Sequence, residues 1–156
     1  MKLLFKQRLF SWFDSYDIYD ERGQTVFTVE GQLAWGHTLH ISDQTGTHIA
    51  TLKQRLLTFL PKFEIYAGER LVGTITKEFT LLKPAFSIDC NGWRVEGSFW
   101  EWDYRILSES HVVAKIEKQF LNWTDTYTID VADEDDCLMS LMVVLAIDAV
   151  KCSQKD

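Results

Sequence analysis

The fold follows from the segment Cys137-Leu138-Met139-Ser140-Leu141-Met142-Val143-Val144-Leu145-Ala146-Ile147-Asp148-Ala149-Val150. Only Ser140 and Asp148 are polar among its fourteen residues. A membrane-spanning helix needs about 20 apolar residues, so this segment is too short and we do not expect the chain to span a membrane. A helix that is apolar on every side must be buried on every side. The segment therefore predicts a helix enclosed by the rest of the protein.

The residues that flank this segment mark the ends of the helix. The acidic run 133–136 precedes it, and Lys151 and Lys155 follow it. Carboxylates at the first turn and lysines at the last match the two poles of the helix dipole, and Asp133 is the expected N-cap. These signals predict a central helix over about residues 134–150.

A repeat built on one isoleucine organises the preceding residues. After most of these isoleucines comes a polar turn rich in Asp, Asn and Gly, and then an alternating run of β-branched and aromatic residues, which is typical of a tight hairpin. Five such hairpins predict ten strands. The isoleucines are spaced 23, 24, 23, 18 and 23 residues apart and are Ile18, Ile41, Ile65, Ile88, Ile106 and Ile129.

Two further strands complete the predicted sheet, one over residues 2–12 and one over residues 126–131. The two prolines, Pro61 and Pro84, fall in connections between hairpins, where the missing N–H does little harm. No linker divides the series, so residues 1–156 are expected to form a single domain, with strands over about residues 2–131. A helix is about 10–12 Å wide, too wide for a filled eight-stranded barrel, whereas an eleven-stranded barrel can hold one. The fold class is therefore mainly β: a twelve-stranded antiparallel barrel that encloses its C-terminal helix.

Composition excludes several classes of protein. The chain has 156 residues, 46% of them hydrophobic, which excludes disorder. Its 16 Lys and Arg against 23 Asp and Glu give a net charge of −7, which disfavours a nucleic-acid partner. Three widely spaced cysteines do not make a disulfide framework. Lys6 and Arg8 interrupt the apolar N-terminus, so a secretory signal is not expected, and the predicted location is cytoplasmic.

The sequence resembles the LURP-one-related family, part of the tubby C-terminal-like superfamily that includes the phospholipid scramblases. The resemblance covers essentially the whole chain, and it implies a tubby-like barrel of twelve strands around a central helix without implying a known reaction. The residues that carry it are Lys6-Gln7-Arg8-Leu9-Phe10-Ser11, Val26-Phe27-Thr28-Val29-Glu30-Gly31, Lys53-Gln54-Arg55-Leu56-Leu57, Phe63-Glu64-Ile65-Tyr66, Gly97-Ser98-Phe99-Trp100-Glu101-Trp102-Asp103-Tyr104 and Trp123-Thr124-Asp125-Thr126-Tyr127, together with the C-terminal helix.

Signals for catalysis and metal binding are weak. The sequence contains no nucleophile elbow, phosphate-binding glycine loop or zinc-protease motif. Glu101 and Asp103 are expected on one outward face of a strand whose aromatic residues point inward. The histidines and cysteines lack zinc spacing, so no cofactor is expected, and Cys137 is interpreted as a buried apolar residue.

The acidic segment 130–136 leaves one question open. Scramblases place a calcium segment just before the same helix, so the resemblance raises calcium binding here. A calcium loop that started at Asp130 would need Gly at its sixth position and Glu at its twelfth, but these positions hold Asp135 and Leu141. Helix capping is the favoured interpretation.

The remaining candidate site consists of two Lys-x-Arg pairs, Lys6 with Arg8 and Lys53 with Arg55. In each pair the Lys stands twelve residues before a repeat isoleucine, whereas Lys77 and Lys118 stand eleven before theirs. Residues i and i+2 of a strand face the same way, so each pair would present two cations to a phosphate-bearing head group. The pairs also resemble the Lys-x-Arg with which tubby domains bind phosphoinositides.

Three functions remain open on this basis. The expected function is a non-catalytic tubby-like barrel that acts as a binding or structural module. The first alternative is a module that binds anionic phospholipid or phosphoinositide at the inner membrane face through the four cations. The second alternative is an enzyme with a shallow external site.

Overall fold

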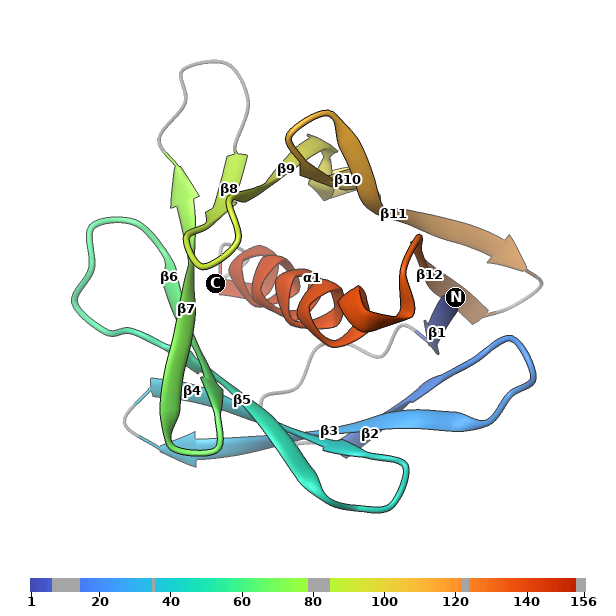
Figure 1. The fold of residues 1–156 in the computed structure, drawn as a ribbon, viewed down its shortest axis with the longest axis horizontal. Coiled ribbons are helices and arrows are strands. Elements are labelled where there is room, and N and C mark those ends of the chain that lie inside the picture. The colour runs from blue at the N-terminus through green and yellow to red at the C-terminus, as the bar shows by residue number, and fades with distance from the viewer. Residues whose placement is uncertain (7–14, 35, 79–84, 122–123, 154–156) are drawn as a thin grey trace.

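The protein is a closed antiparallel barrel of twelve strands around one helix, which confirms the predicted fold class (Figure 1). The computed structural model describes the chain except residues 7–14, 35, 79–84, 122–123 and 154–156. Each strand pairs with its neighbours in sequence, and β1 pairs with β12 to close the ring. The strands are β1 (Lys2–Lys6), β2 (Ser15–Tyr19), β3 (Thr25–Ala34), β4 (Gly36–Asp43), β5 (His48–Gln54), β6 (Lys62–Ala67), β7 (Arg70–Glu78), β8 (Ala85–Ile88), β9 (Trp93–Ser98), β10 (Asp103–Ser108), β11 (His111–Leu121) and β12 (Thr124–Val131).

The isoleucine repeat marks the hydrophobic core of each hairpin. All six repeat isoleucines are buried, with at most 1% of the side chain exposed. Five of them precede tight turns, as predicted. In the first turn, Asp20 Oδ1 accepts hydrogen bonds from the backbone N–H groups of Arg22 and Gln24, and Gly23 adopts a φ of 77°. The repeat therefore combines one buried anchor with one turn.

The central helix begins close to the predicted position and ends later. Residues Glu134–Asp136 form a short 3-10 turn, η2, and α1 then extends over Cys137–Ser153. Asp133 is the N-cap, as predicted, because its carboxylate accepts a hydrogen bond from the backbone N–H of Asp135. The helix continues beyond residue 150 because its last turn is still inside the barrel, where Lys151 is buried.

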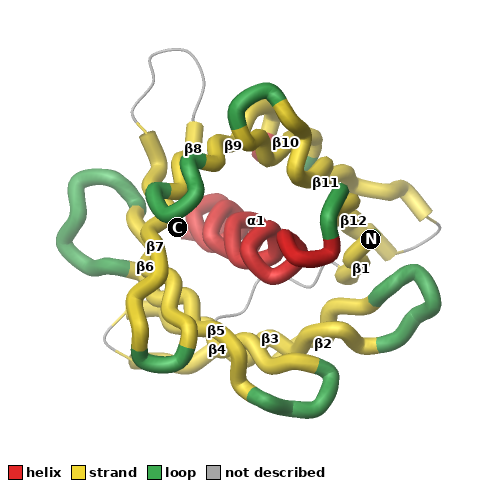
Figure 2. The backbone as a smooth tube through the Cα atoms, in the orientation of Figure 1, coloured by secondary structure: helices red, strands yellow, loops and turns green. Residues whose placement is uncertain are grey.

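Strands surround the helix, as Figure 2 shows with the helix in red and the strands in yellow. Leu141, Val143 and Ile147 have no exposed surface, and Cys137 is only 3% exposed. They belong to one core cluster that also contains the inward side chains of the barrel wall. Burial of the apolar helix therefore unites the core. Among the described residues, no helix has both the length and the apolarity required to cross a membrane.

The barrel has two different rims because its strands alternate in direction. The odd-numbered strands all start at the rim that carries the tight turns and the start of α1, which we call the turn rim. They all end at the opposite rim, which carries the remaining strand connections and the end of α1, and which we call the loop rim. Four of the repeat isoleucines have a Lys twelve or eleven residues before them, and the backbone of these lysines lies near the loop rim: Lys6, Lys53, Lys77 and Lys118.

Two details of the expected strands differ in the structure. Residues 99–101 form a 3-10 turn, η1 (Phe99–Glu101), and Trp102 adopts a φ of 56°, so β10 starts only at Asp103. The prediction that Glu101 and Asp103 share one face of a strand is therefore wrong, because the left-handed conformation of Trp102 breaks the alternation. Trp100 is exposed and does not point inward. In the first predicted strand, β1 ends at Lys6, and residues 7–12 lie outside the described residues.

Candidate functional site

The connection between β5 and β6, residues 55–61, presents apolar side chains to solvent. Leu57 is fully exposed and Phe59 is 96% exposed, the highest values among the large hydrophobic side chains that the structure describes. Leu56 is half exposed beside them. Leu57 adopts a φ of 60°, a backbone conformation that costs free energy for a residue with a side chain. We call these three residues the apolar tip.

Backbone hydrogen bonds hold both ends of this connection. The N–H of Arg55 donates to the carbonyl of Lys62 at 2.9 Å, and the N–H of Lys77 on β7 donates to the carbonyl of Pro61 at 3.0 Å. The chain thus returns directly into β6, where Phe63 is buried in the core. Because both ends of the connection are hydrogen-bonded to the sheet, the apolar tip projects from a fixed part of the barrel.

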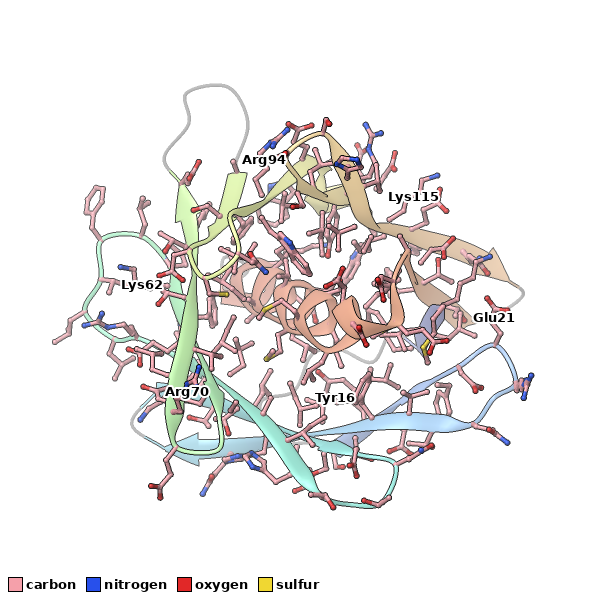
Figure 3. The ribbon with its side chains drawn as sticks, in the orientation of Figure 1. Tyr16, Glu21, Lys62, Arg70, Arg94 and Lys115 are labelled. Atoms are coloured by element: carbon pink, nitrogen blue, oxygen red, sulfur yellow. The ribbon has the colours of Figure 1, made fainter. Side chains whose placement is uncertain are left out.

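Three cations surround the base of the apolar tip. Lys53 is exposed on β5, Arg55 follows the strand, and Lys62 starts β6 (Figure 3 labels Lys62). Arg55 Nε lies 3.2 Å from Glu64 Oε1, and Glu64 is also the cross-strand partner of Lys53. From β5 through β6 these three cations therefore face one carboxylate, which leaves an excess of positive charge.

Glu64 links the cations to Tyr66. The Tyr66 hydroxyl donates a hydrogen bond to Glu64 Oε2, and this hydrogen bond is the main reason that the pKa of Tyr66 is raised. Glu64 thereby accepts from Tyr66 with one oxygen and pairs with Arg55 through the other. Arg55 is held in place beside the tip, an arrangement that the Lys-x-Arg spacing does not predict.

The structure describes one of the two predicted Lys-x-Arg pairs in full. Lys53 and Arg55 lie together at the loop rim, near the end of β5. Lys6 ends β1 at the same rim, while its side chain and all of Arg8 lie outside the described residues. Three strands separate β1 from β5 in the barrel wall, so Lys6 and Lys53 lie on strands that are not neighbours.

Lys77 and Lys118 face differently from Lys53. Their offset from the repeat isoleucine is shorter by one residue, and a shift of one residue reverses the face of a strand. Lys77 pairs with the buried Phe86, and Lys118 Nζ lies 5.9 Å from the centre of the Tyr127 ring, whose side chain is buried. These two lysines therefore belong to the inner side of the loop rim.

Aromatic side chains close the barrel interior at the loop rim. Trp102 packs against Tyr127 with ring centres 4.0 Å apart and against Phe5 at 5.9 Å. Lys151 Nζ, at the end of α1, lies 3.9 Å from the centre of the Trp102 ring, a cation–π contact. Burial, and secondarily the charge of Asp148, raises the pKa of Tyr104 well above its usual range. Aromatic rings and the helix end therefore occupy the interior here.

A groove of about 380 Å³ lies on the outer side of the barrel where β1 meets β2. Leu4 pairs with Tyr19 there, and both line the groove together with Asp20. The Asp20 carboxylate already accepts two backbone hydrogen bonds of its turn. The described lining includes no histidine, cysteine or serine.

The acidic segment at the turn rim serves the helix. Asp133 caps η2, and burial is the main cause that raises the pKa of Asp136, followed by the charges of Asp133 and Asp135. Across the described part of the chain, no three His, Cys, Asp or Glu side chains converge in a way that could hold a metal ion. This geometry does not support calcium binding by the described residues of the acidic segment.

These features define a barrel-around-helix protein with an anchored apolar tip between cations at its loop rim. A family model described as LURP-one-related matches residues 1–148, and the chain belongs to this family. A curated relative, the uncharacterized protein YxjI of Bacillus subtilis (strain 168), is 31% identical over 157 residues, covering 100% of this chain and 97% of the relative.

The fold also matches a solved structure. An Arabidopsis thaliana protein studied by X-ray crystallography aligns with a TM-score of 0.66 and 18% sequence identity, over 96% of this chain and 91% of the plant chain. At this level of identity the likeness concerns the fold alone. The match supports the barrel architecture.

Proposed function

We propose that this barrel is a non-catalytic binding module that docks on anionic phospholipid surfaces through the apolar tip and its cations. The observation that carries the proposal is the exposure of Leu57 and Phe59 directly beside Lys53, Arg55 and Lys62. Apolar side chains that project from an anchored loop can enter the interfacial region of a bilayer. The flanking cations would then lie at the level of the phosphate groups.

The magnitudes favour a weak and reversible contact. Burial of one large apolar side chain contributes about 1.5–3 kcal/mol, and each Lys or Arg near an anionic surface contributes about 1 kcal/mol. The net charge of −7 repels an anionic membrane from most orientations of the protein. Docking would therefore depend on the loop rim facing the membrane. Anionic phospholipids are present in the cytoplasmic leaflet of the membrane, and we propose that this chain is located in the cytoplasm.

Sedimentation with vesicles that contain phosphatidylserine tests the cations. The double variant Lys53→Ala/Arg55→Ala should bind about thirtyfold more weakly than the wild-type protein, because two contributions of about 1 kcal/mol are lost. The loss should shrink at 1 M salt, where the screening length falls to about 3 Å. A suitable control is Arg94→Ala/Lys115→Ala, which removes two exposed cations that are likewise paired with glutamates, on β9 and β11.

The apolar tip is tested separately. Leu57→Ser/Phe59→Ser should weaken vesicle binding at least tenfold at low and at high salt, because apolar transfer is not screened. The tip side chains are exposed, so this variant should unfold at the wild-type temperature. If the wild-type protein does not sediment with acidic vesicles at low salt, the proposal is wrong. An equal loss in the Arg94/Lys115 control would also overturn it, because net charge would then explain the binding.

A further inference from the structure

Two histidine rings face each other on the outer surface of β4 and β5. His40 Nδ1 lies 3.3 Å from His48 Nε2, and the ring centres are 5.3 Å apart. Thr51 Oγ1 lies 2.8 Å from the same His48 nitrogen and 3.3 Å from the same His40 nitrogen. Three donor atoms thus form a compact triangle on the outer wall of the barrel.

A shift in strand register creates this pair. Ile41 pairs with Ala50, but the next residue, Ser42, pairs with His48, so the ladder between β4 and β5 skips Ile49. Without the shift, alternation would direct His48 to the opposite face of the strand. The irregularity places it on the outer face beside His40. Eight residues separate the two histidines in the sequence, a spacing that does not by itself predict a metal site.

Gln32 on β3 orients the His40 ring. His40 Nε2 lies 2.7 Å from Gln32 Oε1, and an amide oxygen can only accept, so Nε2 carries the proton and donates. The lone pair of His40 is then on Nδ1, which faces His48 and Thr51. An outer partner that fixes the tautomer of an imidazole in this way is a regular feature of metal-binding histidines.

Burial and two charged neighbours act on His40. Burial is the main cause that lowers the pKa of His40, the nearby His48 lowers it further, and Glu30 raises it. Glu30 is the cross-strand partner of His40 on β3 and adds a negative charge near the pair.

The distance between the two histidine nitrogens fits one metal ion. Zinc–imidazole bonds are about 2.0–2.1 Å long, and two such bonds at a tetrahedral angle hold their nitrogens about 3.3 Å apart. His40 Nδ1 and His48 Nε2 have this separation. We propose that His40 and His48 bind a divalent transition metal of the class that prefers imidazole, such as Zn²⁺, Ni²⁺ or Cu²⁺, with Thr51 or water in the remaining positions.

Copper is the most sensitive probe, because Cu²⁺ binds most tightly in the series of divalent first-row metals. Titration of the purified protein with Cu²⁺ at pH 7.5 should show one site, with nitrogen couplings from two imidazoles in its electron paramagnetic resonance spectrum. His40→Ala and His48→Ala should each weaken binding at least tenfold and remove one set of couplings. The matched control His111→Ala removes an exposed histidine on β11 and should leave the site unchanged.

Gln32→Leu tests the orientation of the His40 ring. Loss of an outer partner weakens metal binding by about 10- to 100-fold, and both sets of imidazole couplings should remain. The experiment contains no vesicles, so its result is independent of the membrane proposal. If the wild-type protein shows no two-imidazole spectrum, or if the His40→Ala/His48→Ala variant binds Cu²⁺ as tightly as the wild-type protein, the inference is wrong.

Discussion

Replacement of Leu141 by aspartate should prevent the barrel from folding. Leu141 lies in the second turn of α1 and has no exposed surface, and strands surround the helix. A buried carboxylate without a partner costs several kcal/mol, a large part of the 5–15 kcal/mol that is typical of a whole domain. We expect the purified L141D protein to aggregate, or to lack a near-ultraviolet circular dichroism signal and a cooperative thermal transition.

Two further variants make this result interpretable. Leu71→Asp introduces the same charge at an exposed position on β7, and it should change the unfolding free energy by less than about 0.5 kcal/mol. Leu141→Ala should fold but lose about 2–5 kcal/mol, the usual cost of a cavity in a core. A soluble L141D protein with a wild-type unfolding transition would show that the helix is not enclosed.

Replacement of Gly97 by alanine should destabilise the barrel by about 2–4 kcal/mol. Gly97 adopts a φ of +118°, and an added Cβ would lie 2.7 Å from the carbonyl oxygen of Asp103 and 2.8 Å from the Cα of Tyr104. Both are backbone atoms of β10, which pairs with Gly97 through Tyr104, so neither can move away at low cost. Backbone strain and overpacking each contribute about 1–3 kcal/mol.

Gly92→Ala is the matched control for backbone strain alone. Gly92 also has a positive φ, +70°, but a Cβ there would meet no atom within 4 Å. Its substitution should cost about 1–2 kcal/mol. Urea denaturation of both variants and the wild-type protein measures the difference. Equal losses at positions 92 and 97 would show that β9 and β10 are not in the close contact described above.

The hairpin repeat and the apolar helix were predictable because the residues that specify each of them are close together in the sequence. Five of the six repeat isoleucines are followed within a few residues by a tight turn, and Asp20 and Gly23 stabilise the first of these turns. Asp133 likewise caps η2 from within its own turn. The strand expected across Trp100 and Trp102 starts only at Asp103. Trp102 has a left-handed conformation there and packs against Tyr127 and Lys151, which are distant in the sequence.

The cations illustrate how little information separates the two faces of a strand. Lys53 stands twelve residues before its isoleucine and Lys118 eleven before its own. That single residue places Lys53 outside the barrel and Lys118 over the Tyr127 ring on the inner side. The offset of one residue therefore distinguishes the two lysines, since the period of a strand is two residues.

Local sequence signals account for the strands, the tight turns and the enclosed helix, since alternation, turn chemistry and apolarity act among residues close together in the chain. Which of these residues form sites depends on the tertiary structure. The ion pair of Arg55 with Glu64 and the contact of His40 with His48 depend on cross-strand register. The exposure of Leu57 and Phe59 depends on where the closed wall ends. The identity of an apolar residue does not show whether its side chain lies in the core or at a rim. The closure of the barrel determines which of these two positions the side chain has.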